Sequence, residues 1–444
     1  MKVDQIPYNP GPAAWTCILA SDKGHPELSQ NKSCEWLVIG AGFAGLSAAR
    51  RLQVKRPKDR IIVLEAQALA EGPSGRNSGF MIDLPHDLSS KDYGSDLNLD
   101  RITISQNRYA IDFARKTVSE LALPRESFQE IGKINAAATG TGFSHNMDYS
   151  SHLSKLGEVW EHYDSKTMEE ITGSKYYIGG LFTPGTVMLQ PALYVRSLGK
   201  KLLSKRLEIF EKSPVISLKR SGSDWCTITP KGTIFSPKVI LATNGHLESF
   251  GYFKRRLVHL FTYGSMTKPL HREEKLLLGG RDNWGLTSAD PLGSTVRRIR
   301  FNSEDRIVIR NSVTYEPKMR PENNKLNSIY EAHLKSFRSR FPQLSRTQME
   351  YKWGGHLTLS LNKVPAFAEV ESGLFTACCQ NGLGTVKGTL HGIAASDYAL
   401  GEKNEIVSQL LKADYPQKLP PEPIAGIFAK ILINLGKFRA GKEF

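Results

Sequence analysis

The chain has 444 residues, of which 40% are apolar and 23% are charged. This composition excludes a wholly disordered protein, and at roughly 150 residues per domain the length allows two or three domains. The 59 Lys and Arg residues outnumber the 44 Asp and Glu residues and give a formal charge of +15, but the basic residues are dispersed along the chain. We therefore expect a solvated basic surface and no nucleic-acid partner.

The five cysteines are odd in number and show no C-x-x-C spacing, which argues against a disulfide framework and a zinc ribbon. We expect no bound metal. The first 33 residues contain no apolar stretch of the kind that a secretory signal needs, and the most apolar segment, residues 424–435, is interrupted by Gly426, Lys430 and Asn434. A cytoplasmic protein without a membrane span is the resulting expectation.

An apolar run followed by three glycines carries the first functional signal. Residues 36–39 predict a buried strand, and Gly40, Gly42 and Gly45 follow it with the spacing G-x-G-x-x-G. The first glycine permits a tight turn, and the second lets the backbone approach a pyrophosphate. The third packs the next helix against the strand, so that the amides at the start of the helix face the anion.

A second apolar run, residues 61–64, ends at Glu65, which lies 20 residues after Gly45. A carboxylate at this position suits hydrogen bonds from an adenosine ribose and disfavours a 2′-phosphate. Strand, glycines, helix, strand and acid thus stand in the order of a βαβ fingerprint. The segment predicts binding of FAD or NAD rather than NADP.

Three later segments favour FAD over NAD. EGPSGRNSGF covers residues 71–80, KVILATNGH covers 238–246, and GLFTACCQNGLGTVKG covers 373–388 as a strand, a glycine loop and the start of a helix. With GAGFAG, and with WGG ahead of Pro365, these segments resemble the FAD-dependent amine and amino-acid oxidoreductases of the D-amino-acid-oxidase-like superfamily. The pattern is most similar to the branch of γ-glutamylputrescine oxidase and pipecolate oxidase, and it covers about residues 34–410.

The resemblance implies an α/β fold in which a Rossmann-like FAD-binding domain of the glutathione-reductase type carries an inserted α+β substrate domain on a mixed or antiparallel sheet. Both domains would be discontinuous in sequence. The FAD-binding domain would take residues 34–90, 176–255 and 366–412, the substrate domain 91–175 and 256–365, the N-terminal extension 1–33, and a Pro-rich segment with an amphipathic helix 413–444.

The resemblance also implies which residues hold the flavin. Arg76 and Asn77 match positions that approach the pyrophosphate and the isoalloxazine, and Ser74 is able to donate to a phosphate. Backbone amides of residues 384–386 are expected to face flavin N1 and the C2 carbonyl, where negative charge grows on reduction. The full expected set is Gly40, Gly42, Phe43, Ala44, Gly45, Glu65, Ala66, Ser74, Gly75, Arg76, Asn77, Ser78, Val215, Thr243, Asn244, Gly245, Gly382, Leu383, Gly384, Thr385 and Val386.

Three departures from relatives refine the expected chemistry. Residues 352–361, which match a stretch carrying a flavin-linked cysteine in sarcosine oxidases, contain no cysteine, so we expect non-covalent FAD. Val308 aligns with a lysine that promotes the reaction with oxygen, which leaves O2 or another electron acceptor open. Lys387 is a candidate cation for the flavin, one residue out of the family's register, and the alternative is an exposed lysine in the first helical turn.

Two strand-like runs flank a turn at residues 302–305 and suggest a basic wall. Alternation places Arg298 and Arg300 on one face of the first run. It also places Arg306 and Arg310 on one face of the second. The alternative interpretation is a solvated outer face of the sheet, because charge on a strand face usually meets water.

The candidate catalytic residues are Arg76, His86, Arg298, Arg310 and Lys387, with His86 alternatively a structural hydrogen-bonding group. The arginine that holds an α-carboxylate in glycine oxidases corresponds to Leu357, so a simple α-amino acid loses support. We expect oxidation of a C–N bond in a small secondary or acyl-conjugated amine that carries a remote carboxylate. Hydride transfer to flavin N5 would give an imine that hydrolyses. The alternatives are an opine or imino-acid oxidase or dehydrogenase and, outside enzymes, a flavin-binding or RNA-associated protein.

The end of the chain predicts an amphipathic helix that follows LPPEP. Docking of its apolar stripe onto the same protein is one interpretation. Weak contact with a membrane interface or another subunit is the other, because basic residues accompany the stripe. The stripe consists of Ile424, Ile427, Phe428, Ile431, Leu432, Leu435 and Phe438, and the basic residues are Lys430, Lys437, Arg439 and Lys442.

Overall fold

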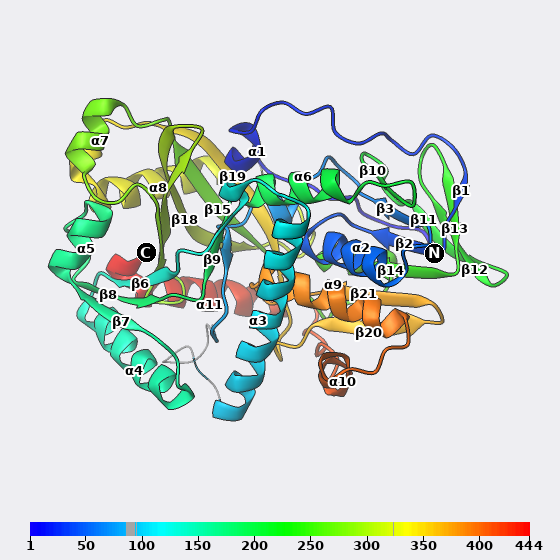
Figure 1. The fold of residues 1–444 in the computed structure, drawn as a ribbon. Coiled ribbons are helices and arrows are strands. Elements are labelled where there is room, and N and C mark those ends of the chain that lie inside the picture. The colour runs from blue at the N-terminus through cyan, green and yellow to red at the C-terminus, as the bar shows by residue number, and fades with distance from the viewer. Residues whose placement is uncertain (86–93, 95, 323) are drawn as a thin grey trace.

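The computed structural model describes residues 1–85, 94, 96–322 and 324–444. In this part of the chain two large sheets stand in adjacent halves of the molecule, and Figure 1 shows the half that contains the glycine motif on the right. The predicted α/β fold, a Rossmann-like half joined to an α+β half, is confirmed.

The right-hand half is built on a six-stranded sheet whose strands run parallel except for the edge strand β20. Side chains of the strand at residues 36–39 alternate between two apolar layers. Trp36 and Val38 pack with helices α2 and α9, and Leu37 and Ile39 pack against a smaller sheet on the other face. The strand order is β10 (Leu207–Phe210), β3 (Ile61–Leu64), β2 (Trp36–Ile39), β14 (Lys238–Leu241), β21 (Leu374–Cys378) and β20 (Ala366–Glu371).

The left-hand half is built on a mixed eight-stranded sheet. Its order is β19 (Met349–Leu359), β15 (Val258–Thr267), β18 (Glu304–Tyr315), β17 (Thr295–Phe301), β16 (Trp284–Ser288), β6 (Lys133–Ala137), β8 (Gly179–Thr183) and β7 (Glu161–Asp164). The smaller sheets are β1 (Lys32–Ser33), β13 (Thr233–Ser236), β12 (Asp224–Ile228) and β11 (Ser217–Ser221), and β4 (Phe80–Met81), β9 (Val187–Leu189) and β5 (Phe128–Gln129).

One predicted domain boundary, at residue 176, does not coincide with the strand pairing. The predicted FAD-binding segment 176–255 includes β8, but β8 pairs with β6 and β7 in the eight-stranded sheet. The chain returns to the six-stranded sheet only after β8, because α6 (Pro191–Leu202) leads into β10, which pairs with β3. The other predicted boundaries stay predictions.

Helices cover the outer faces of both sheets. α2 begins directly after Gly42, and α9 follows the 382–385 turn that the sequence predicted to start a helix. The helices are α1 (Ala14–Cys17), α2 (Phe43–Lys55), α3 (Leu97–Glu120), α4 (Gly140–Leu156), α5 (Ser165–Thr172), α6, α7 (Arg272–Leu278), α8 (Lys325–Arg340), α9 (Val386–Ala399), α10 (Glu405–Lys412) and α11 (Ile424–Ala440).

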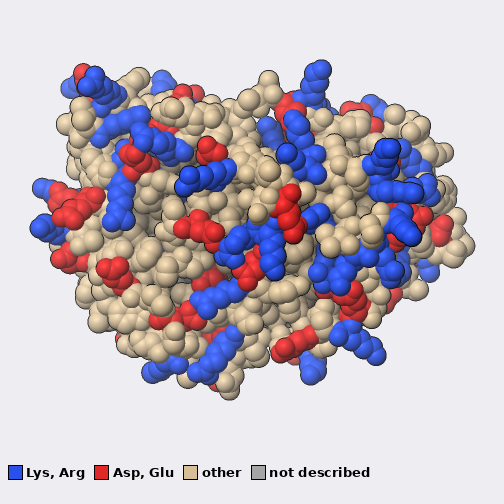
Figure 2. Space-filling view, in the orientation of Figure 1, with Lys and Arg blue, Asp and Glu red and all other residues tan. Residues whose placement is uncertain are grey.

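Charge is mixed on the surface seen in Figure 2, where Lys and Arg are spread over the visible face with Asp and Glu among them. This matches the dispersed basic residues of the sequence. Among the helices of the described residues, none combines the length and the apolar character that crossing a bilayer requires.

Candidate active site between the two sheets

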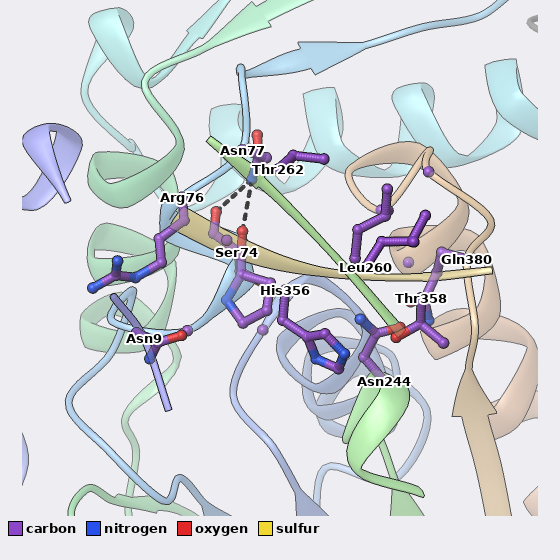
Figure 3. Close-up of a pocket in the computed structure, with 18 of the residues that line it drawn as sticks. Asn9, Ser74, Arg76, Asn77, Asn244, Leu260, Thr262, His356, Thr358 and Gln380 are labelled. Carbon is purple, nitrogen blue, oxygen red and sulfur yellow. Dashed lines mark hydrogen bonds between the residues drawn. The ribbon is translucent and has the colours of Figure 1, made fainter. Parts of the chain in front are cut away.

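A cavity of about 520 Å³ lies between the six-stranded and the eight-stranded sheets and takes side chains from both. This volume is in the range of small-molecule and cofactor sites. Its lining includes the loops that follow β2, β3 and β14, which places it at the carboxyl ends of parallel strands, where open α/β sheets bind ligands. Figure 3 shows part of this cavity.

The glycine motif adopts the predicted geometry. Gly40 has φ of +102°, which L side chains rarely adopt, and a Cβ there would lie 2.6 Å from the Ala242 carbonyl oxygen. A Cβ on Gly45 would overlap the Gly40 carbonyl oxygen, so this glycine lets α2 approach the strand closely. A Cβ on Gly42 would collide with Ser74 Oγ, which accepts a hydrogen bond from the Phe43 amide at 3.2 Å.

Glu65 lies at the end of β3 and lines the cavity. Its Oε2 accepts from the Ala41 amide at 2.9 Å, and its Oε1 accepts from the Gln67 amide at 3.0 Å. Burial raises the pKa of this carboxyl above its ordinary value, against the effect of the two amides. The carboxylate is therefore fixed next to the glycine turn, where a ribose hydroxyl would satisfy it further.

The segment after β3 builds one wall of the cavity. Asn77 donates to the carbonyl oxygens of Pro73 and Ser74, at 3.3 and 2.7 Å, and Figure 3 shows these bonds within the loop. Arg76 lines the cavity, but its guanidinium extends away from His356 in Figure 3. Its donors reach carbonyl oxygens of Glu71, Pro10, Gly11 and Gly354, so this side chain ties together three distant segments.

The start of α9 presents backbone donors to the cavity. Gly384 and Thr385 line it, and Thr385 Oγ1 donates to the Phe80 carbonyl oxygen at 2.6 Å. Within the described residues, the amides of 384–386 have no acceptor, while the amide of Lys387 donates to Leu383. Three free amides at a helix N-terminus suit an anionic oxygen.

Most of the expected cofactor residues line the cavity. Gly45, Gly75, Gly245 and Val386 do not: they pack beneath its walls. The expected residues that line it are Gly40, Gly42, Phe43, Ala44, Glu65, Ala66, Ser74, Arg76, Asn77, Ser78, Val215, Thr243, Asn244, Gly382, Leu383, Gly384 and Thr385. A carboxylate, a tight glycine turn and a free helix N-terminus in one cavity fit a dinucleotide such as FAD.

The catalytic candidate on α9 is not in the observed cavity lining. Lys387 lies in the first turn of α9 close enough to His391 to lower the pKa of that imidazole, and it is absent from the cavity wall. Lys387 is therefore not part of the observed cavity lining, and its role as a cation for the flavin stays a prediction. His86 lies outside the described residues.

The predicted basic wall is divided between two faces of the eight-stranded sheet. β17 and β18 pair antiparallel around a tight turn at Asn302 and Ser303, both with positive φ. The turn is shorter than the predicted 302–305, because Glu304 and Asp305 already belong to β18. Directly opposed residues share a face, and Arg310 opposes Thr295. Thr295 and Arg298 are three residues apart on β17, so alternation places them on opposite faces of the sheet. Arg298 and Arg310 therefore point to opposite sides of the sheet, and a single wall is wrong.

Arg298 belongs to an ion-pair cluster away from the cavity. Its guanidinium lies 2.7 Å from Asp305 Oδ2 and donates to the Gly279 carbonyl oxygen at 2.6 Å, and Arg300 Nε lies 3.1 Å from Asp305 Oδ1. These contacts lower the pKa of Asp305, whose burial alone would raise it. The charge of Arg298 is neutralised locally, so its proposed role with substrate is also wrong.

Arg310 faces the cavity together with Thr295, Val308 and Leu357. No hydrogen bond or ion pair joins its side chain to another described residue. Burial lowers the pKa of Arg310 below its ordinary value, which reflects the cost of holding an unpaired guanidinium there. This side chain is available to bind an anion.

The end of the chain supplies a second cation, which is one of the basic residues that accompany the apolar stripe. Lys437 of α11 lines the cavity with Leu432, Ile433 and Phe444, and burial lowers the pKa of its ammonium. Residues 5–9 of the N-terminal extension also line the cavity. Neither terminal segment carries a motif, so these contacts could not be predicted from local sequence.

A histidine cluster was also missed. His259 Nδ1 lies 3.1 Å from His356 Nε2, and His259 Nε2 lies 3.1 Å from Glu248 Oε2. His246 packs edge-on against His356, and both line the cavity. Burial lowers the pKa of His246 to about 4 and that of His356 well below its ordinary value, so both imidazoles are neutral near pH 7. The cluster links the cavity to Glu248, whose side chain is 19% exposed, and can pass a proton between them.

The cysteines do not reach the cavity lining of the described residues. Cys378 and Cys379 are buried behind it, and burial raises the pKa of their thiols to about 11 and about 12. Non-covalent attachment of a flavin stays a prediction.

Comparison with known proteins relates this cavity to a family. A family model described as "DAO: FAD dependent oxidoreductase" matches residues 35–398. A probable oxidoreductase OrdL of Haemophilus influenzae is 26% identical over 400 residues, which are 86% of each chain. The gamma-glutamylputrescine oxidoreductase of Escherichia coli is 22% identical over 426 residues, covering 90% of this chain and 89% of that one.

Solved structures share the fold. Glycine oxidase from Geobacillus kaustophilus superposes with a TM-score of 0.69 at 14% identity, covering 88% of this chain and 100% of that one. L-proline dehydrogenase from P. horikoshii superposes with a TM-score of 0.64 at 16% identity, covering 85% of this chain and 96% of that one.

Proposed function

Because this chain belongs to the DAO family of FAD-dependent oxidoreductases, we propose that it oxidises a C–N bond in a small secondary or acyl-conjugated amine whose carboxylate lies several bonds from the reacting carbon. When bound, FAD supplies the oxidising chemistry by accepting a hydride from the carbon next to nitrogen. The imine that results takes up water and separates into a carbonyl compound and an amine.

The observation that carries this proposal is the partly buried, unpaired Arg310 on the sheet face that meets the cavity. A guanidinium held away from water without a carboxylate is costly, and a bound carboxylate removes that cost through a bidentate pair. Lys437 adds a second positive charge to the same cavity. The two cations together favour an acidic substrate.

Apolar side chains in the cavity wall support the proposal that the carboxylate lies far from the reacting amine. Leu260 and Leu357 are paired neighbours on β15 and β19, and both line the cavity. No cation stands at position 357, where relatives would hold an α-carboxylate. An apolar wall also favours the neutral amine, the form from which hydride loss is possible.

The cavity further offers a route for the proton that the ammonium form must lose. His356 and His246 are neutral and line the cavity, and His259 connects His356 to Glu248.

The name of the Escherichia coli relative, gamma-glutamylputrescine oxidoreductase, describes an amine with a distant carboxylate and agrees with the proposed class. An opine or imino-acid substrate satisfies the same cations and is the second candidate. The acceptor for the electrons is O2 or another oxidant.

The test uses a panel of amines added to the holoenzyme without oxygen, with reduction of the flavin followed by absorbance. Reduction by an acidic amine, and not by its amide analogue, is the expected result. A flavin that no amine reduces would favour the non-catalytic flavin-binding or RNA-associated class instead.

Arg310→Ala tests the carboxylate contact. Loss of this charged partner should cost about 2–4 kcal/mol, a factor of roughly 30 to 1000 in kcat/KM for the acid and little for the amide. Arg300→Ala is the matched control, since Arg300 lies on the other face of the same sheet and its side chain is 49% exposed. Equal discrimination between acid and amide in wild type and Arg310→Ala would overturn the assignment.

A further inference from the structure

Helix α11 carries its large apolar side chains on the outside of the molecule. Phe438 is 86% exposed, Leu432 is 67% exposed and Phe428 is 60% exposed. The docking interpretation of this stripe is therefore wrong, because none of its side chains is buried in the chain. The stripe consists of Ile424, Ile427, Phe428, Ile431, Leu432, Leu435 and Phe438, each between 46% and 86% exposed.

The inner side of α11 consists mostly of small residues and fixes this orientation. A Cβ on Gly436 would overlap Leu292 Cδ1, so the helix packs closely against the body of the protein at this glycine. α11, drawn in red in Figure 1, contacts β18. The inner residues are Ala425, Gly426, Ala429, Ile433, Gly436, Lys437 and Ala440, at intervals of one helical turn.

Both ends of α11 are attached, so the apolar side cannot simply rotate inward. Ahead of the helix, Tyr315 Oη donates to Glu422 Oε1 at 2.5 Å. After it, Glu443 accepts from the amides of Ala138 and Thr139, at 2.8 and 3.0 Å. Seven exposed apolar side chains on a fixed helix form a continuous patch of the kind that marks an interaction surface.

The charges beside this patch favour an anionic partner. Lys430, Arg439 and Lys442 are exposed, and residues 424–442 contain no Asp or Glu. A second copy of the chain would bring the same cations together, in a protein of net charge +15. An apolar helix face flanked by Lys and Arg matches the chemistry of an anionic bilayer surface.

We propose that α11 is a membrane-surface anchor that lies in the headgroup region of an anionic bilayer, with its seven apolar side chains inserted. The helix does not cross the bilayer. Leu432 is both inserted and part of the cavity lining, so the cavity faces the membrane surface. This inference is independent of the identity of the amine.

The test is co-sedimentation of the holoenzyme with vesicles. Binding to vesicles of phosphatidylglycerol and phosphatidylcholine is expected, at least about tenfold tighter than to phosphatidylcholine alone, and weakened by 0.5 M NaCl, because each juxtamembrane cation adds attraction to anionic lipid. The variant Phe428→Ser with Phe438→Ser should lose at least about tenfold in affinity. Unchanged flavin absorbance and unchanged amine oxidation in detergent would show that it is folded.

Leu276→Ser with Leu277→Ser is the matched control, since these leucines of α7 are 74% and 63% exposed and lie elsewhere. The control should bind vesicles like wild type. Absence of wild-type binding to anionic vesicles, or equal loss in both variants, would overturn the proposal. Sedimentation velocity that gives a dimer which only the α11 variant abolishes, without vesicle binding, would assign the face to a second copy instead.

Discussion

Arg298 and Arg310 have the same side-chain chemistry but differ in their partners. Arg298 is 2% exposed and lies 2.7 Å from Asp305, so its charge is already satisfied. Arg310 lies on the opposite face, toward the cavity, and has no partner of this kind among the described residues. A guanidinium can bind a substrate carboxylate only where the protein has left it unpaired.

We expect the dinucleotide site to depend most directly on the absence of a side chain at Gly42. In the variant Gly42→Ala the new Cβ would displace the Ser74 hydroxyl, which is bonded to the Phe43 amide, and would enter the space expected for the pyrophosphate. We expect FAD affinity to fall at least about tenfold, equivalent to 1.4 kcal/mol, and Gly42→Val to abolish binding. Fluorescence titration of the apoprotein with FAD measures the loss.

Gly72→Ala provides the control for this experiment. Gly72 also lines the cavity, has an extended backbone with φ of −76°, and has no atom within 4 Å of an added Cβ. Its FAD affinity should match that of wild type. Equal affinities of the Gly42→Ala variant and wild type would mean that the cofactor does not approach the backbone at this turn.

At the scale of one element, β18 presents two cavity-lining residues on the same strand face. Val308 and Arg310 both line the cavity, two residues apart, while Ile307 and Ile309 pack on the other side in an apolar cluster with Phe337. The strand therefore presents an apolar position and a cation to the cavity. From the family resemblance of the sequence, we expect relatives to carry an oxygen-promoting lysine at the position of Val308.

Val308 predicts slow reaction of the reduced enzyme with oxygen. Reoxidation in air-saturated buffer, measured by stopped flow, should be slower than reoxidation by an artificial quinone or dye. Val308→Lys should accelerate the oxygen reaction by at least about tenfold, because a cation stabilises the negative charge that oxygen acquires. Val308→Met, of similar length without charge, should leave the rate unchanged. Wild-type reoxidation that is faster with oxygen than with the dye would contradict this interpretation.

At the scale of the whole molecule, the two halves and both ends of the chain close the cavity together. Arg297 donates from β17 to the carbonyl oxygens of Ser78 and Leu189, each at 2.8 Å. These bonds join the eight-stranded sheet to β9 and to the loop after β3 that lines the cavity. Arg76 joins the same loop to the N-terminal extension and to β19. The site therefore depends on contacts between segments that are hundreds of residues apart.

Buried neutral histidines make the stability of this assembly sensitive to acid. Burial lowers the pKa of His391 to about 3, against an ordinary value of 6.5. Below pH 6.5 the unfolded chain binds a proton at this residue and the folded protein does not, so the free energy of unfolding falls as pH falls, by about 1.4 kcal/mol per pH unit, until the pH approaches 3.

His391→Leu should remove this dependence. Urea unfolding with excess FAD at several pH values between 7 and 4 should show a smaller decline for the variant than for wild type, while the changed packing shifts the variant's curve by a constant. The difference in slope, about one proton, is the diagnostic quantity. Parallel curves would mean that His391 is charged in the folded protein or is not buried.

The sequence by itself determined the features that depend on local spacing. The glycine turn, the carboxylate at Glu65 and the start of α9 follow from residues close together along the chain, whose covalent geometry and amphipathic pattern already limit the backbone. The pairing of β17 with β18 belongs to the same class, because a short turn joins the strands. These features predicted a site for FAD or NAD, and the family resemblance carried by the later segments implied the fold and the choice of FAD.

Tertiary structure alone decided which side chains meet. Alternation divided the arginines of each strand between two faces, but only the register of β17 against β18 shows that Arg298 and Arg310 face opposite ways. The helical repeat of 3.6 residues per turn identified the apolar stripe of α11 in the sequence. In the structure the small residues of α11 face the protein and Glu443 holds the end of the chain, so the stripe faces outward. His259 and His356 meet because β15 pairs with β19 across about a hundred residues. Such contacts are fixed by the burial of distant segments against one another, and local spacing carries no information about that partner choice.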